Sequence, residues 1–382
     1  MNVLAVTNLF PNRAEPGRGV FNRQQFVELK NFCDLKVIAP LPWVPGFLGA
    51  AHGNVPLQEV IDGIDVYHPR YLVTPKIGRR FYGQWYYQAI KPLALRLRAE
   101  FSFDLIFATW GYPDCYGASL VARELSVPLV CRVHGTDINV GAENPVRRSL
   151  MKKAFDQARR VVVNSAGLKA GVENIGVAPE KISVITNGVD TRRFFPLDKA
   201  ACRRELRLDG SKRHVLFIGN LVDIKGVHHL IDAAGIMPEN VILHVIGSGP
   251  LEARLKSQAQ AMEKMGRVFF HGRKPHEEIP RWLNAADVLC LPSANEGCPN
   301  VVLEALACRT PVAASRVGAI PDLVDSADKG RLFTPGDAEA IAKSIGEILI
   351  QNEQGVRPQF EAISWRDNAA RLFEIFKAAV HS

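Results

Sequence analysis

The sequence predicts an α/β protein built from two doubly wound parallel sheets, and three observations support this fold class. Short apolar runs alternate with segments of helical periodicity, as expected of successive strand–helix units around parallel sheets. The alternation pauses once, near residue 190, and then restarts. The 382 residues, 47% of them hydrophobic and 23% charged, are enough for two globular domains with sizeable cores.

The apolar runs predict the strands of both domains. In the first half these strands cover residues 3–7, 35–39, 66–68, 105–109, 129–133, 160–164 and 182–186. A turn that begins at Asn187-Gly188 and ends at Pro196 predicts the linker. In the second half the predicted strands cover residues 214–218, 241–246, 268–271, 288–291, 311–314 and 331–333. Apolar residues at helical spacing predict an amphipathic helix over 365–380.

Charge and cysteine content limit the class of protein. The formal net charge is +8, with most of the excess in the first half. Between residues 76 and 98, basic residues interleave with aromatic ones, which suits an anionic membrane surface; a solvated basic helix face packed by aromatics is the alternative. No signal peptide, membrane span or nucleic-acid-binding motif is visible. Seven cysteines without a Cys-x-x-Cys pair indicate a reducing compartment, so we expect a cytoplasmic protein that contacts the inner face of the cell membrane.

The segment with the most chemical information is residues 293–306, where two carboxylates stand eight positions apart. Glu296 lies in a turn after the predicted strand 288–291, and Glu304 is the one charge in the apolar run 301–308. A carboxylate in a buried helix must be paired or remain near water, and α/β sheets bind ligands beyond the carboxyl ends of their strands. The spacing alone leaves two interpretations: a polar ligand site, or a solvated loop residue and a helix residue paired with an arginine.

A glutamate, seven residues and a second glutamate, at the start of a helix after a strand, resemble the donor-sugar motif of retaining glycosyltransferases of family 4. The resemblance implies their GT-B fold, with two Rossmann-like domains facing a cleft. It places an acceptor-side domain over residues 1–190, a linker over 191–198 and a nucleotide-sugar-binding domain over 199–364. It also implies that a final helix, 365–382, crosses back to the first domain.

The loop after the predicted strand 214–218 suggests an anion site. Gly219 lets the backbone approach a ligand, and Lys225-Gly226 precede a helix whose N-terminus exposes N–H groups. A surface lysine in a loop is the alternative interpretation. Family 4 has Gly-Arg-Leu, three residues and Lys-Gly here, with both cations on the nucleotide diphosphate. This chain has Asn220 in place of the arginine, so the resemblance implies that Lys225 carries more of the leaving-group charge.

Further motifs match the family in the same order along the chain. His134-Gly135-Thr136-Asp137 matches its His-Gly-x-Asp, although a lone histidine after a strand is more often structural than catalytic. Residues 247–250 resemble its Gly-x-Gly-Pro turn beside the nucleobase and ribose, and 317–322 resemble its Val-Gly-Gly-Ile-Pro-Glu. The first turn, residues 8–20, contains a glycine-rich loop but not the complete fingerprint of a NAD site.

The resemblance assigns roles residue by residue. Lys225 stabilises the departing phosphate, and His134 contacts the donor sugar or supports its reactive carbon. Glu296 holds hydroxyls of the donor sugar, and a second role as a transient nucleophile stays open. Glu304 accepts hydrogen bonds from the ribose, and the remaining donor-binding residues are Gly17, Gly19, Gly219, Asn220, Gly249, Gly297, Cys298, Pro299, Asn300 and Val301. On the acceptor side we expect Asp137, from the motif match, and Arg79 and Arg80, from the basic-aromatic pattern of segment 76–98.

The implied activity is retaining transfer of a hexosyl group from a nucleotide-diphosphate sugar, with UDP as the expected nucleotide. The acceptor is a saccharide or lipid-linked saccharide in the synthesis of an envelope polysaccharide or glycolipid. We expect no cofactor and no metal, because no Asp-x-Asp or histidine cluster stands in a matching loop. Two alternatives remain: a nucleotide-sugar-binding scaffold subunit with weakened catalysis, which Asn220 supports, and a GT-B nucleotide-sugar epimerase.

Overall fold

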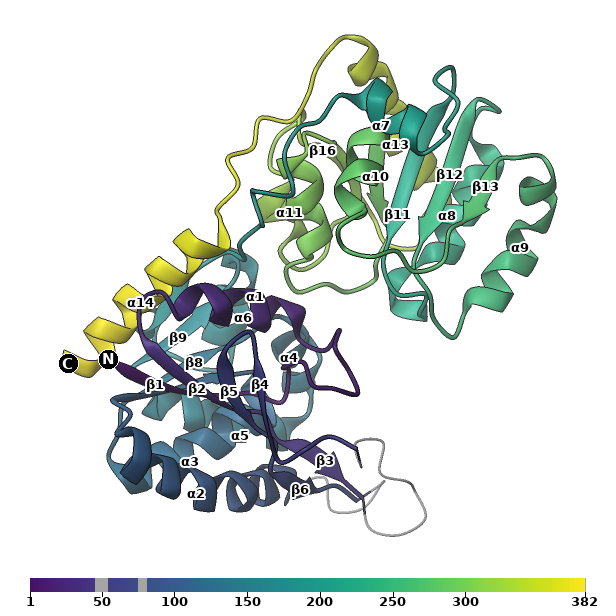
Figure 1. The fold of residues 1–382 in the computed structure, drawn as a ribbon. Helices are drawn as coiled ribbons and strands as arrows, with labels where there is room; N and C mark the ends of the chain where they lie inside the picture. Colours follow the sequence, from purple (N-terminus) through teal and green to yellow (C-terminus); the bar gives the residue numbers. More distant parts are fainter. Residues whose placement is uncertain (45–53, 75–80, 382) are drawn as a thin grey trace. The chain divides into compact units, whose positions relative to one another are not determined.

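The computed structural model describes residues 1–44, 54–74 and 81–381, and the chain divides into two units. Unit 1 contains Met1–Gly188 together with Trp365–Ser382, and unit 2 contains Val189–Ser364 (Figure 1). Each unit is built around a sheet of mainly parallel strands with helices against it. The fold class predicted from the sequence is therefore confirmed.

The described part of unit 1 contains an eight-stranded sheet in the order β10-β9-β8-β7-β1-β2-β5-β4. Its strands are β1 (Asn2–Val6), β2 (Asp34–Ile38), β4 (Gln58–Ile61), β5 (Ile64–Tyr67), β7 (Leu105–Thr109), β8 (Leu129–Arg132), β9 (Arg160–Val163) and β10 (Ile182–Val184). The strand order reverses between β1 and β7, so the loops that follow these two strands diverge there. Such a reversal is where doubly wound sheets bind ligands.

Three short strands of unit 1 were not predicted from the sequence. β4 is an edge strand that pairs antiparallel with β5, and β3 (Leu41–Trp43) pairs with β6 (Arg70–Leu72) in a separate two-stranded sheet. These strands have three or four residues and are partly exposed, so they lack the continuous apolar run of a buried parallel strand.

The helices of unit 1 pack against both faces of its sheet, and α14 (Trp365–His381) is one of them. The ring of Phe376 on α14 lies 5.0 Å from that of Phe107 on β7, and Asn368 Nδ2 donates to the carbonyl of Thr186 at 2.6 Å. The others are α1 (Val20–Leu29), α2 (Tyr82–Phe101), α3 (Tyr116–Leu125), α4 (Thr136–Asn139), α5 (Pro145–Gln157) and α6 (Ala166–Asn174).

The described part of unit 2 contains a six-stranded parallel sheet in the order β13-β12-β11-β14-β15-β16, reversing between β11 and β14. All six predicted strands are present, as β11 (Arg213–Ile218), β12 (Val241–Ile246), β13 (Val268–Phe270), β14 (Val288–Leu291), β15 (Val312–Ser315) and β16 (Gly330–Phe333). The helices around it are α7 (Lys199–Glu205), α8 (Val227–Ile236), α9 (Glu252–Lys264), α10 (Ile279–Ala285), α11 (Asn300–Ala307), α12 (Ile320–Leu323) and α13 (Ala338–Glu353).

A chain of three histidines crosses the sheet of unit 2. His214 Nε2 lies 2.8 Å from the carbonyl oxygen of Asp209, and His214 Nδ1 lies 2.9 Å from His244 Nε2. His244 Nδ1 lies in turn 3.0 Å from His271 Nε2. A carbonyl only accepts, so neutral His214 carries its proton on Nε2, and the same logic places a proton on Nε2 of the other two rings. Burial favours these neutral rings, because it lowers the pKa of His244 to about 3 and that of His271 to about 4.

Lowering the pH from about 6.5 to about 4 should destabilise unit 2. Unfolded histidines take up protons in this window while the folded chain excludes them, so the stabilisation present above pH 6.5 is lost as the pH falls. Each excluded proton contributes a slope of up to about 1.4 kcal/mol per pH unit. Urea unfolding across this window measures the slope, and His244→Gln should have a shallower one; equal slopes would contradict the prediction.

Candidate functional site

The strand reversal of unit 2 brings two loops into contact, one after β11 and one after β14. The backbone N–H of Ala294 donates to the carbonyl of Ile224 at 2.8 Å. Gly226 precedes α8 with a φ of 63°, and a Cβ added to it would lie 2.3 Å from the carbonyl oxygen of Pro292. Only glycine fits at this position, since it accepts both the positive φ and the close approach of the neighbouring backbone.

Lys225 and Glu296, the two catalytic candidates of this unit, form an ion pair at that contact. Lys225 Nζ lies 2.6 Å from Glu296 Oε1, and Ser293 Oγ donates to the same oxygen at 2.7 Å. Glu296 is 8% exposed, whereas the Lys225 side chain retains 24% of its exposure. The nearly buried carboxylate is therefore satisfied by a cation that still reaches solvent.

Helix N-termini make the surroundings of this pair electropositive. α8 begins with Val227-His228-His229 and α11 begins with Asn300-Val301-Val302, so their first turns contain no acidic side chain. Exposed N–H groups and the helix dipole favour a bound anion at such positions. The predicted residues Gly297, Cys298 and Pro299 form the connection between Glu296 and α11.

The loop that carries Glu296 is held by residues 317–322, which were identified in the sequence only as a motif match. Gly318 has a φ of 55°, and a Cβ there would lie 2.0 Å from the carbonyl oxygen of Glu296. The N–H of Ala319 donates to the carbonyl of Gly297 at 2.8 Å. The segment 317–322 therefore positions Glu296 through its backbone.

The loop after β12 lies directly against the loop after β11. Leu221 N–H donates to the carbonyl of Ser248 at 3.0 Å, and Leu251 N–H donates back to the carbonyl of Leu221 at 3.1 Å. The predicted residues Gly219, Asn220 and Gly249 are thereby brought together, and Asn220 is exposed.

Glu304 has a partner that the sequence analysis missed. On α11, its Oε1 lies 3.1 Å from His276 Nε2, and this hydrogen bond raises the pKa of His276. The His276 ring also lies 5.1 Å from the ring of Phe194. The sequence does place His276 shortly after β13, at the carboxyl edge of the sheet, but its spacing to Glu304 of 28 residues carries no pattern.

In unit 1, Asp137 holds the loop after β8. Its Oδ1 accepts from the N–H groups of His134 and Gly135 at 3.0 and 2.8 Å, and its Oδ2 accepts from Gly111 at 2.9 Å. The residue is only 3% exposed. Asp137 therefore fixes the backbone of the loops after β7 and β8, and its place on the acceptor side stays a prediction.

His134 presents a neutral ring. Burial, and then the charge of Arg132, hold its pKa well below the usual 6.5. The ring packs 4.6 Å from that of Phe21, and among the described residues its Nε2 has no hydrogen-bond partner. The predicted Gly17 and Gly19 lie in the loop that leads into α1, where Gly19 is the N-cap.

A buried carboxyl group beside the β1/β7 reversal was also missed. Asp114 accepts from Tyr86 Oη at 2.8 Å and from the N–H of Asn8. Burial raises its pKa to about 8, so it is largely protonated at neutral pH. Asp114 looked like an ordinary loop acid in the sequence because nothing in the local pattern signals its burial.

Several described residues of the basic-aromatic segment 76–98 are buried or have partners within unit 1. Tyr86 is fully buried in the core of unit 1, so it is not available to a membrane surface. Lys91 pairs with Glu124 at 2.7 Å, and Arg98 donates to the carbonyl of Phe103. The acceptor-side candidates Arg79 and Arg80 lie outside the described residues.

Within residues 1–44, 54–74 and 81–381, no group of three or more His, Cys, Asp and Glu side chains could hold a metal ion. No helix in the same part of the chain is long and apolar enough to cross a membrane.

Comparison with known proteins gives two family matches. Residues 198–364 match the family described as Glycosyl transferases group 1, and residues 34–193 match Glycosyltransferase Family 4. The chain is 28% identical over 374 residues to the putative teichuronic acid biosynthesis glycosyltransferase TuaC of Bacillus subtilis (strain 168), covering 94% of this chain and 91% of that protein. It is 33% identical over 253 residues to the D-inositol 3-phosphate glycosyltransferase of Corynebacterium urealyticum, covering 61% and 59%.

Solved structures share the fold at low sequence identity. The sucrose-phosphate synthase of Thermosynechococcus elongatus superposes with a TM-score of 0.76 at 20% identity, covering 99% of both chains. Anabaena Alr3699/HepE in complex with UDP superposes with a TM-score of 0.72 at 20% identity, covering 99% of this chain and 100% of that one.

Replacing Gly318 by alanine should displace the Glu296 loop, because the added Cβ would meet the Glu296 carbonyl oxygen at 2.0 Å. Gly346→Ala is the matched control: Gly346 lies in α13, and a Cβ there meets nothing within 4 Å. The control should be neutral or stabilising by up to about 1 kcal/mol. Binding of a nucleoside diphosphate, measured by calorimetry, should weaken in Gly318→Ala alone; equal affinities would mean that the loop tolerates the shift.

Proposed function

We propose that this chain, which belongs to the family 4, group 1 glycosyltransferases, transfers a sugar from a nucleoside-diphosphate sugar to a saccharide or lipid-linked saccharide. We further propose that UDP is the nucleotide and that the product is an envelope polysaccharide or glycolipid. The name of the Bacillus relative, a teichuronic acid biosynthesis glycosyltransferase, supports this product class. The HepE structures in complex with UDP and with UDP-glucose support the donor.

The observation that carries the proposal is the Lys225–Glu296 ion pair at the strand reversal of unit 2. A donor diphosphate competes with Glu296 for the ammonium group of Lys225. Once the lysine turns to the phosphate, Lys225 and the N-terminus of α8 stabilise the charge that develops on the leaving group. Glu296 keeps its hydrogen bond from Ser293 and accepts hydrogen bonds from hydroxyls of the donor sugar.

Retention follows from a front-face route in which the leaving phosphate takes the proton of the acceptor hydroxyl. After Lys225 has turned to the phosphate, Oε1 of Glu296 still accepts the hydrogen bond from Ser293, which favours a sugar-positioning role over a nucleophilic one. We propose that the reaction needs neither a cofactor nor a metal ion. The anomeric configuration of the product, determined by NMR, tests retention directly, since an inverted product excludes this route.

Two further residues complete the proposed site. Glu304 accepts hydrogen bonds from the ribose hydroxyls while His276 orients its carboxylate from the other side. In unit 1, the low pKa of His134 keeps its ring neutral, so this side chain has no proton to give as an acid at neutral pH.

Replacing Lys225 by alanine should weaken UDP binding by about 10- to 100-fold, the range expected for the loss of a charge-assisted hydrogen bond. Lys256→Ala is the control, since Lys256 forms a similar pair with Glu252, at 2.8 Å, on the exposed surface of α9. Calorimetry with UDP, GDP, ADP and NAD, in the presence of a chelator, measures both the nucleotide preference and the independence from metal.

The thermal unfolding midpoint of each variant shows whether the fold is kept, because Lys225→Ala leaves Glu296 without its cation. Unchanged UDP affinity in a folded Lys225→Ala protein would overturn the donor site. Binding of NAD alone would overturn the glycosyltransferase proposal as a whole.

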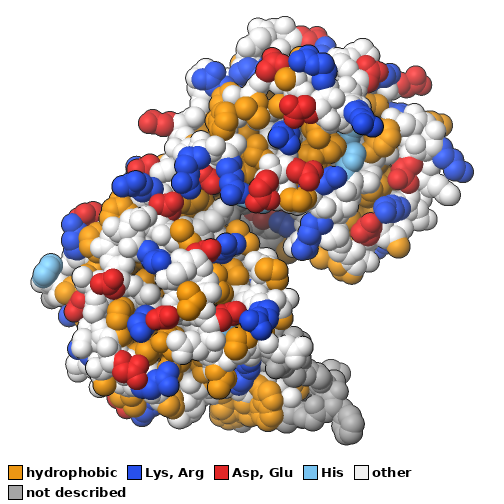
Figure 2. Space-filling model, viewed as in Figure 1, with side chains coloured by type: hydrophobic (Ala, Val, Ile, Leu, Met, Phe, Trp, Pro, Cys, Tyr) orange, Lys and Arg blue, Asp and Glu red, His pale blue; other side chains and the backbone are white. Residues whose placement is uncertain are grey.

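We also propose peripheral contact with an anionic membrane through segment 76–98. Phe81, at the start of α2, is 45% exposed, and hydrophobic side chains gather on the visible face of unit 1 near β6 and α2 (Figures 1 and 2). An aromatic side chain beside arginines suits the lipid headgroup region.

Phe81→Ser combined with Arg79→Ser and Arg80→Ser should reduce sedimentation with vesicles that contain anionic lipid. The loss follows from removing an aromatic anchor and two charges worth about 1 kcal/mol each at such a surface. Lys377→Ser, which removes a lysine paired with Glu374 on α14, is the control. If the triple variant sediments like the unaltered protein, segment 76–98 does not bind the membrane.

A further inference from the structure

Unit 2 has a second polar cluster at the amino ends of β11 and β14, opposite the proposed donor loops. Arg213 is the first residue of β11, and Asp287 immediately precedes β14. The donor loops begin at the other ends of these strands, after Ile218 and Leu291. At roughly 3.3 Å per residue, strands of this length separate the two places by on the order of 15 Å.

The cluster surrounds a cavity of about 120 Å³. Among the described residues, the charged side chains that line it are four cations and two carboxylates: Lys199, Arg203, Arg213, Arg357, Asp287 and Glu353. The lining therefore has a formal excess of two positive charges. An excess of positive charge around a partly open pocket favours the binding of an anion.

The ion pairs inside the cluster account for both carboxylates. The carboxylate of Asp287 accepts hydrogen bonds from Lys199 Nζ at 2.8 Å, from Arg203 Nη2 at 2.7 Å and from the N–H of His214 at 2.7 Å. Glu353 receives Arg213 Nη2 at 2.6 Å. Asp287 and Arg203 are 4% and 7% exposed, so their pair is buried, whereas the Lys199 side chain remains 32% exposed.

Arg357 carries one of the two uncompensated charges, and the other arises because Lys199 and Arg203 share the single carboxylate of Asp287. Arg357 Nη1 donates to the carbonyls of Asn352 and Val356 and to the side-chain oxygen of Asn352, all of which are uncharged. In the described part of the chain it forms no ion pair. These bonds hold the guanidinium at the end of α13, beside the cavity.

The positive charges of the cluster repel one another. Burial lowers the pKa of Lys199, and the positive charges of Arg203 and Arg357 lower it further against the opposing effect of Asp287. A bound anion would relieve this repulsion, and it would link α7, the start of β11 and the segment after α13.

We propose that this cavity binds a phosphate-like oxyanion, held mainly by Arg357 with Arg213 and Lys199 around it. The guanidinium fork matches two oxygens of a tetrahedral oxyanion. The volume is well below the roughly 300–1,000 Å³ of pockets that take drug-sized ligands, so a nucleotide does not fit. This site is distinct from the proposed donor site and does not depend on it.

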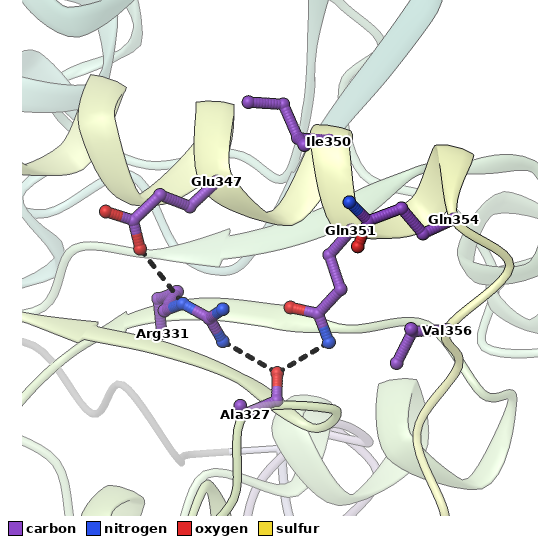
Figure 3. A pocket seen from close by; sticks show the side chains of 7 residues that line it. All are labelled: Ala327, Arg331, Glu347, Ile350, Gln351, Gln354 and Val356. Carbon is purple, nitrogen blue, oxygen red and sulfur yellow. Dashed lines mark hydrogen bonds and ion pairs between the residues drawn. The ribbon is translucent and has the colours of Figure 1, made fainter.

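A neighbouring depression on unit 2 supplies the matched control. It measures about 470 Å³ and contains one arginine, Arg331, which pairs with Glu347 at 3.0 Å. Figure 3 shows Arg331 on β16 and Gln351 on α13 both turned toward the carbonyl of Ala327. Glu347 compensates the charge of Arg331, so Arg331→Gln should leave oxyanion binding unchanged.

The test is the thermal unfolding midpoint as a function of inorganic phosphate, with ionic strength held constant by chloride. Phosphate at ten times its dissociation constant should raise the midpoint by about 3 to 6 °C. Arg357→Gln should lose this rise, while Arg331→Gln and the donor-site variant Lys225→Ala should keep it. Glu353→Gln should bind phosphate more tightly than the unaltered protein, because it removes a negative charge from the rim.

Arg357→Gln should lower the affinity for phosphate, and Glu353→Gln should raise it. Opposite changes in affinity separate ligand binding from a purely structural effect of the substitutions. No rise beyond the chloride control, or the same rise in Arg357→Gln, would overturn the proposal. A rise that disappears in Lys225→Ala would also overturn it by assigning the phosphate to the donor loops. Repeating the titration with glycerol phosphate distinguishes a site for free phosphate from one for the phosphate group of a larger molecule; binding of either supports an oxyanion site.

Discussion

The contact between the loops after β11 and β14 is the constraint on which the proposed donor site depends. Because the strand order reverses between these two strands, both loops leave the sheet at the same place, and Gly226 lets their backbones touch. That contact brings Lys225 to within 2.6 Å of Glu296, although 71 residues separate them in the sequence. A second glycine, Gly318, fixes the Glu296 loop from the side of α12. Gly226 and Gly318 therefore set the positions of the two loops, and Lys225 and Glu296 supply the charges of the proposed donor site.

The ion pair explains how two opposite charges persist at a nearly buried position before a donor binds. A lone buried carboxylate is costly, and a lysine partner offsets that cost while remaining able to move to a phosphate. Serine at position 293 keeps one hydrogen bond on Glu296 in either state. At the amino end of the same sheet, Asp287 accepts from buried Arg203 and from half-buried Lys199, and Arg357 has no carboxylate partner among the described residues. One sheet thus presents two electropositive ends with different amounts of compensation.

Much of this organisation was predictable. All thirteen predicted strands are present in the structure, and the most buried of them, such as β7, β12 and β14, are almost entirely apolar runs. The ordered motifs gave a family resemblance that the two family matches confirm. The edge strand β4 and the pair β3–β6 escaped prediction because they are short and half exposed. His276 and Asp114 escaped for another reason: their burial and partners come from segments far apart in the chain.

The order of residues along this chain sufficed to establish two α/β halves, their family and the candidate residues Lys225, Glu296 and Glu304. Periodicity and motif spacing are local properties, so they can be read from the sequence without the tertiary structure. Only the tertiary structure decides which charged side chains form ion pairs, because this pairing depends on strand order and on contacts between loops. The Glu304–His276 pair, the histidine chain from His214 and the cationic cavity around Arg357 each join separate elements of unit 2. No local pattern encodes such distances, because the charge and burial of a group are set by everything that packs around it.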